Sequence, residues 1–156
     1  MGRLQELYIS RMINYLVSEG AKMADRALAS KETKNRSENQ ADAFGYAVYF
    51  NREVKKKGYA RPTPLAEKTH RGWDAIGVSE GTGREWLDEF FATWKPDGKG
   101  FVLIVVNAAF YSAILEQGRG SIKRKYRIIS QIWGDMEDIQ KKFRGATIAL
   151  KNANPQ

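Results

Sequence analysis

The residues able to do chemistry in this chain are a single histidine, several carboxylates and two basic segments. A serine or threonine nucleophile needs a neighbouring base, and His70 is the one histidine available. His70 lies between Thr69 and Arg71 in a polar stretch, which favours an exposed side chain over a catalytic one. The absence of cysteine excludes disulfides, thiolate zinc sites and a cysteine nucleophile. We therefore expect no enzyme activity and no catalytic residue.

Two other segments resemble ligand sites only in part. Residues 79–84, SEGTGR, have the glycine content of a phosphate-binding loop but lack the spacing and the lysine of a P-loop, so we interpret them as the approach to a helix. Asp135, Glu137 and Asp138 are close in sequence, but such positions on a helix point in different directions. They are expected to form a solvated face. We predict neither a metal site nor a cofactor.

Basic residues are the clearest functional signal. The formal net charge is +8, and the charges are unevenly placed: residues 52–71 and 119–127 are basic, whereas residues 74–97 are acidic. Either basic segment alone could be a solvated hairpin or a solvated helix start; both together favour contact with an anionic surface or an acidic partner subunit. The sequence has no base-reading motif, so DNA would be bound through its phosphates. The candidate contacts are Lys55, Lys56, Lys57, Arg61, Lys123, Arg124, Lys125 and Arg127.

The first half of the chain is predicted to position these residues on a long helix and a hairpin. Apolar residues recur at helical spacing over residues 3–29, with Gly20 as the weak point of that helix. Residues 30–39 are polar and are expected to form a loop. A strand is predicted at 44–50, and Asn51-Arg52 would turn the chain into a second, charged strand that begins near Val54.

The second half is predicted to hold the central strand and three further helices. Thr82 and Glu85 form a capping-box pattern, and FVLIVV at 101–106 is apolar enough for a strand buried on both faces. Trp86, Trp94 and Trp133 are expected in the core, whereas Trp73, in a loop, is the interface candidate. The expected segments are a long loop at 58–83, helices at about 83–94, 108–116 and 128–144, with a strand as the alternative at 125–130, and a tail at 151–156.

These elements predict an α+β fold: a long N-terminal helix, a small mostly antiparallel sheet with a buried central strand, and flanking helices. The 156 residues are enough for a single domain, which we place at 1–150. The sequence contains neither an apolar run long enough to span a bilayer nor a secretory signal. We expect no membrane contact and a cytoplasmic site of assembly.

The stretch after the central strand resembles a known family. Asn107, Tyr111, Glu116 and Gly118 match the pattern of small neck proteins of tailed bacteriophages, the head–tail connector or tail-completion family, with Ser112 in place of the usual alanine. Upstream, residues 35–44 are similar to a second family segment: Ser37, Asn39 and Asp42 agree with it, whereas Glu38 replaces glycine and Gln40 replaces leucine.

The resemblance implies a structural virion protein of the phage neck or tail, assembled in the bacterial host cytoplasm. Such a subunit would form a homo-oligomeric ring, six- or twelve-fold, between the portal and tail proteins, with DNA in the lumen. Segregated positive and negative segments suit subunits that meet head to tail. The alternative is a basic cytoplasmic nucleic-acid-binding protein without sequence-specific recognition, and a small enzyme is the least favoured hypothesis.

Overall fold

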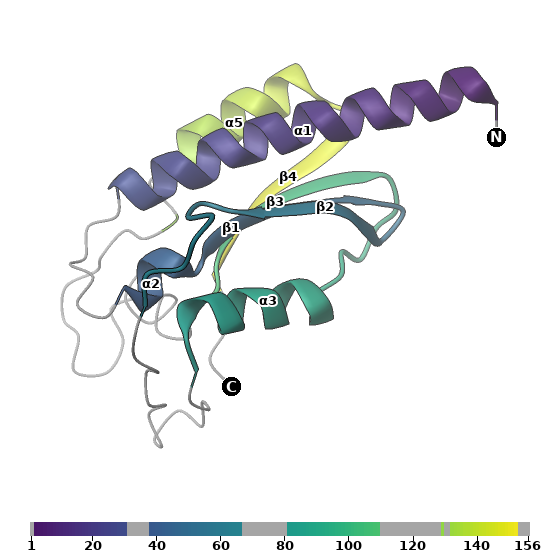
Figure 1. Cartoon of the computed structure of the whole chain (residues 1–156). Helices are drawn as coiled ribbons and strands as arrows, with labels where there is room; N and C mark the ends of the chain where they lie inside the picture. The colour runs from purple at the N-terminus through teal and green to yellow at the C-terminus, as the bar shows by residue number, and fades with distance from the viewer. Residues whose placement is uncertain (1, 31–37, 67–80, 110–128, 130–131, 153–156) are drawn as a thin grey trace.

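A four-stranded sheet between two helical layers forms the framework of the protein (Figure 1). The computed structural model describes residues 2–30, 38–66, 81–109, 129 and 132–152. Helices α1 and α5 cover one face of the sheet and α3 covers the other (Figure 1). This is the expected α+β class. The elements are α1 (Arg3–Ser30), α2 (Asn39–Asp42), β1 (Phe44–Phe50), β2 (Glu53–Tyr59), α3 (Gly83–Thr93), β3 (Phe101–Asn107), α5 (Trp133–Lys142) and β4 (Ala146–Asn152).

The strand order is β2-β1-β3-β4, with β1 antiparallel to both β2 and β3, and β4 parallel to β3. All seven residues of β3 are buried, which confirms the predicted central strand. Strand β4 was not expected. Lys151 and Asn152, predicted to open the tail, lie in this strand instead. A strand that pairs in parallel with its neighbour is joined to it by a long crossover. The sequence therefore has no tight-turn motif next to β4 that would indicate this strand.

Side chains alternate between two cores, one on each face of the sheet. On β1, for example, Val48 faces α1 and α5, whereas Tyr49 faces α3. Residues of a strand point alternately to its two faces, and the continuous apolar run of β3 fills both cores. The core below α1 and α5 includes Met12, Leu16, Met23, Phe44, Leu103, Val105 and Ile148; the core above α3 includes Ala47, Leu87, Phe91, Ile104 and Val106.

Gly20, expected to weaken the first helix, lies where α1 packs closely against the sheet. A methyl group at this position would lie 2.8 Å from Leu103 Cδ1 and 3.0 Å from Tyr46 Cδ2. The helix continues through Gly20 without a break, because the packing against β1 and β3 outweighs the modest helix penalty of about 1 kcal/mol for glycine. None of the described helices is long and apolar enough to cross a bilayer.

The turns and caps agree with the sequence. Asn51 and Arg52 both have positive φ angles, the backbone of a tight hairpin turn, as predicted. The amide of Gly100 donates to Asn51 Oδ1 at 3.0 Å and Arg52 Nε donates to the carbonyl of Pro96 at 3.1 Å. Helix α3 begins at the predicted cap, where the amide of Glu85 donates to Thr82 Oγ1 at 3.3 Å and that hydroxyl donates to the Glu85 carboxylate at 3.0 Å.

The tryptophans differ in their burial. Trp94 packs edge-on against Tyr49 at 5.2 Å between ring centroids and stacks on Phe90, and Trp86 is half-buried, so both join the α3 core as expected. The prediction for Trp133 is wrong: its side chain is 54% exposed. Helix α5 begins at Trp133, not at 128, and the positions that face the core are Ile132, Met136, Ile139 and Phe143.

Two other predicted segments fall on residues that the structure does not describe. These are the helix at 108–116 beyond Ala109, and residues 125–130 apart from Ile129. The loop at 58–83 is likewise described only in part, because β2 occupies its first two residues and residues 67–80 lie outside the described ranges.

Tyr49 provides a test of the α3 core. Its hydroxyl is buried without a hydrogen-bond partner in the described part of the chain, and burial raises the pKa of Tyr49 to about 12. The folded state thus holds this proton more tightly than the unfolded state, whose tyrosine pKa is about 10. The contribution of this pKa difference to the free energy of unfolding is fully present below about pH 10 and is lost as the pH rises toward 12.

We expect Tyr49→Phe to match or exceed the wild-type free energy of unfolding at neutral pH, by up to about 1 kcal/mol, because it removes an unpaired buried hydroxyl. Between about pH 10 and 12 the variant should lose less stability than the wild type. Urea unfolding followed by circular dichroism measures both effects. Tyr8→Phe, at a tyrosine that is 59% exposed, is the control. Identical pH profiles for wild type and Tyr49→Phe would contradict this account.

Candidate functional site

The first basic segment lies on β2, an edge strand whose residues Glu53–Lys57 are all exposed. Its three lysines do not form one surface. Val48 of β1 pairs with Lys56 and Tyr49 with Val54, so Lys55 is the extra residue of a β-bulge. Lys55 and Lys56 both turn toward α1, whereas Lys57 lies on the other face, 5.8 Å from the centroid of the Phe91 ring.

Arg61 does not join these lysines. Its Nη1 atom lies 2.5 Å from the carboxylate of Glu38 and 3.4 Å from that of Asp42. The side chain of Arg61 is 23% exposed. Its charge is thus paired with two carboxylates of the fold, and its contact with an outside anion stays a prediction.

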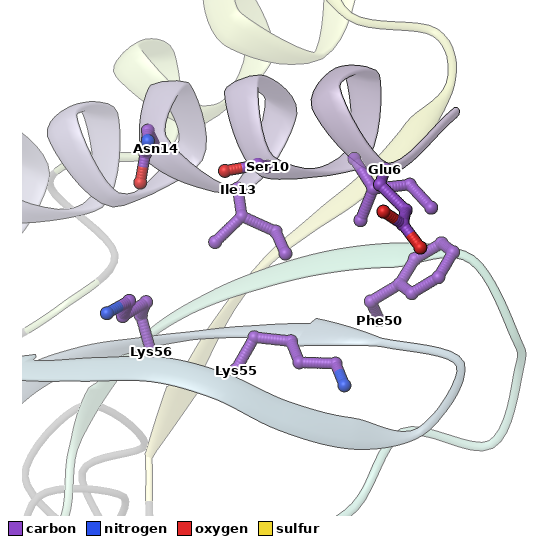
Figure 2. A pocket seen from close by; sticks show the side chains of 8 residues that line it. Glu6, Ser10, Ile13, Asn14, Phe50, Lys55 and Lys56 are labelled. Carbon is purple, nitrogen blue, oxygen red and sulfur yellow. The ribbon is translucent and has the colours of Figure 1, made fainter. Parts of the chain in front are cut away.

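Lys55 and Lys56 line an open groove between the first half of α1 and the hairpin, with a volume of about 420 Å³. Figure 2 shows Glu6 and Ile13 extending down from α1, Phe50 and Lys56 rising from the strands, and Lys55 extending along β2. Most of the lining surface is apolar. The full lining consists of Glu6, Ile9, Ser10, Ile13, Asn14, Phe50, Lys55 and Lys56.

Within the described residues, the two lysines of the groove differ in their ion pairing. Lys55 pairs at 3.0 Å with Glu53, an exposed residue of the same strand, and this hydrogen bond lowers the pKa of Glu53. Lys56 has no ion-pair partner within the described residues. An exposed pair such as Lys55–Glu53 contributes little stability, so both lysines are available to an anionic partner. The groove is suited to a bulky apolar group with acidic neighbours.

A polar cluster at the other end of the strands was missed by sequence reasoning. Helix α2 has four residues, all buried, and Asn39, Gln40 and Asp42 are polar. The Asp42 carboxylate has no solvent exposure and accepts hydrogen bonds from the amides of Leu65, at 3.0 Å, and Ala66, at 2.8 Å, as well as from Arg61. Residues 61–66 are therefore fastened to α2.

The same short helix also holds the start of α3 and the end of β3. The amide of Gly83 donates to Asn39 Oδ1 at 2.8 Å, and Asn107 Nδ2 donates to the carbonyl of Gln40 at 3.0 Å. Asn107 Oδ1 in turn accepts from the amide of Ala109 at 3.1 Å. Asn39, Asp42 and Asn107, which carry part of the family resemblance, thus have structural roles at one site.

A neighbouring group links β2 to α3. Tyr59 donates its hydroxyl proton to Asp88 at 2.5 Å, and this hydrogen bond is the main reason that the pKa of Tyr59 is raised. The Arg84 guanidinium lies 3.6 Å from the centroid of the Tyr59 ring and also donates to the carbonyl of Arg61. Asp88 thus connects β2 to α3 through Tyr59.

The carboxylates of α5 are not gathered into one cluster. Asp135 accepts a hydrogen bond at 2.6 Å from Arg26 of α1, whereas Glu137 and Asp138 are exposed. Over the described ranges, no three residues of metal-ligating type come together.

The remaining site residues predicted from the sequence lie outside the described residues. They are His70, Trp73, Tyr111, Glu116, Gly118, Lys123, Arg124, Lys125 and Arg127. Comparison of the chain with protein-family models, with curated proteins and with solved structures finds no match.

The polar cluster around α2 can be tested through Asp42. Asp42→Ala leaves the amides of Leu65 and Ala66 without their acceptor and removes one partner of Arg61. We expect the free energy of unfolding to fall by about 3 kcal/mol, because buried donors are left unpaired. Urea unfolding measures the change. Asp97→Ala, at an exposed carboxylate, should change stability by less than about 0.5 kcal/mol. Equal effects of the two substitutions would show that α2 does not hold the fold together.

Proposed function

We propose that this protein is a ring-forming neck or tail-completion subunit of a tailed bacteriophage, located in the virion, which joins portal to tail around the DNA channel. The proposal starts from the family resemblance of Asn107 and its following residues, and of Asn39 and Asp42. In this role the subunit performs no chemistry: its function is to bind further copies of itself and the adjoining portal and tail proteins.

The observation that carries the proposal is an apolar patch at the start of α1. Leu4, Leu7 and Tyr8 are 83%, 47% and 59% exposed. Their spacing of three and four residues places them on one side of the helix. The first turns of α1 extend beyond the hairpin end of the sheet (Figure 1), where Tyr8 contacts the ring of Phe101 but still leaves most of its own surface exposed. Contiguous exposed apolar side chains are typical of surfaces that bind another protein.

The division of the first basic segment also supports a subunit over a dedicated nucleic-acid-binding protein. A DNA-binding surface requires several cations on one face, but Lys57 lies on the α3 face and Arg61 is paired within the fold. Among the described lysines of this segment, Lys55 and Lys56 share a face, and they border a mostly apolar groove. We therefore assign the DNA contact in the channel to the second basic segment, residues 119–127.

Assembly of the full chain is the primary test. Light scattering coupled to size-exclusion chromatography should show a concentration-dependent oligomer, and negative-stain microscopy should show rings. Leu4→Ser combined with Leu7→Ser should weaken assembly about tenfold or more, because the substitutions remove exposed apolar contact area. The stability of the subunit should change by less than about 0.5 kcal/mol. Arg11→Ser, at an exposed polar position of α1, is the control. A strict monomer at every concentration would contradict the proposal.

The DNA contact has a separate test. Replacing Lys123, Arg124 and Lys125 together by glutamine should weaken binding of duplex DNA to the assembled protein, and should reduce the dependence of log affinity on log salt by about 2 to 3. Assembly itself should be unchanged. Replacing Lys141 and Lys142, on α5, by glutamine is the control, for which a smaller change is expected. An unaltered salt dependence in the triple variant would show that this segment does not contact DNA.

A further inference from the structure

The exposed part of α5 carries an aromatic ring and carboxylates, whereas the groove is apolar and bordered by lysines. Trp133 is the first residue of this helix and is 54% exposed. Glu137 follows one helical turn later on the same side, and the adjacent Asp138, also exposed, points about 100° further round the helix. We call Trp133, Glu137 and Asp138 the acidic ridge. It combines a large aromatic side chain with two carboxylates for which the described residues record no ion pair.

The groove offers the opposite combination. Ile9, Ile13 and Phe50 provide apolar walls, and its volume of about 420 Å³ is within the range that accommodates a bulky side-chain cluster. Lys55 and Lys56 border it, and Glu6 is the one acidic residue among its lining residues; Lys55 is also paired with Glu53, so Lys56 is the cation of the groove that has no ion-pair partner within the described residues. An indole ring with flanking carboxylates matches this surface in both polarity and charge.

The two surfaces lie at opposite edges of one molecule. The groove is bordered by β2, the first strand in the sheet order, whereas α5 packs on β4, the last. Both are on the face that α1 and α5 cover (Figure 1). Helix α1 separates them, so the ridge of one molecule cannot occupy its own groove. A second copy, displaced sideways, can place its ridge there, and its own groove is then free for a third.

We propose that the acidic ridge of one copy of this chain docks in the groove of the next, with Trp133 against Phe50, Ile9 and Ile13, and with Glu137 and Asp138 facing Lys55 and Lys56. This contact is heterologous: each copy uses a different surface on either side, which generates a closed ring when the rotation between copies permits it. The proposal rests on the self-assembly in the proposed function, and it identifies the lateral interface.

Two full-length variants with reversed charges, one in the groove and one in the ridge, test the contact. One variant carries Lys55→Glu and Lys56→Glu, and the other carries Glu137→Lys and Asp138→Lys. Each variant alone brings like charges together at every interface and should assemble at least about tenfold more weakly than the wild type. In an equimolar mixture every groove can meet a ridge of opposite charge in an alternating ring. The mixture should therefore recover assembly to near the wild-type level, measured by light scattering.

Two further variants separate this contact from other effects. Trp133→Ala should weaken assembly at least about tenfold without loss of helical circular dichroism, because an exposed aromatic side chain is removed from the centre of the interface. Glu89→Lys with Asp97→Lys reverses two exposed charges in and just after α3, away from the groove and the ridge, and should leave assembly unchanged.

The outcomes distinguish this proposal from the proposed function. If the wild type assembles but the charge-reversed variants and Trp133→Ala assemble equally well, the ridge–groove contact is wrong while the ring-forming role stands. If the Lys55 and Lys56 variant loses only DNA binding, those lysines serve a nucleic acid and the contact is again wrong. If mixing the two charge variants fails to recover assembly, the groove and the ridge are not partners. A wild type that is monomeric at all concentrations overturns both.

Discussion

A buried carboxylate is stable only when hydrogen bonds replace its lost water, and Asp42 imposes this constraint on the whole end of the molecule where α2 lies. The amides of Leu65 and Ala66 and the guanidinium of Arg61 satisfy it. The neighbouring Asn39 holds Gly83 so closely that a methyl group there would overlap the Asn39 carbonyl. The chain leaving β2 and the chain entering α3 are therefore fixed to the same short helix. This joint sets where α3 starts, and hence which face of the sheet it covers.

The sheet then determines which surfaces are left for other molecules. Its faces are covered by α1 with α5 and by α3, and its centre is filled by β3, so the available surfaces are the two edges and the exposed sides of the helices. The bulge at Lys55 decides what the β2 edge offers, because it puts two consecutive lysines on the α1 side, where a regular strand would put only one. An irregularity of one residue thus converts part of a charged strand into the wall of a groove.

Much of the fold could be predicted from the sequence because its signals are local. The hairpin at Asn51-Arg52, the cap at Thr82 and the apolar strand 101–106 each depend on residues within a few positions of one another. Strand β4 and helix α2 depend on distant partners: Ile148 pairs with Leu103, and Asp42 is satisfied by residues after β2. A polar helix of four residues has no periodicity to detect. The site was predictable only in part for the same reason, because adjacent basic residues do not reveal whether they share a face or, like Arg61, are paired inside the fold.

The parallel pairing of β3 with β4 has a consequence for how the chain folds. Strands β2 and β3 each pair antiparallel with β1, which precedes both of them in the chain, so these three strands can pair as they are synthesised. The partner of the second edge of β3 comes last, after the long crossover. Until it is made, the most apolar strand of the protein has an open edge, the kind of edge that adds strands from other chains. The period between synthesis of β3 and of β4 is thus the time at which nascent chains are most exposed to aggregation.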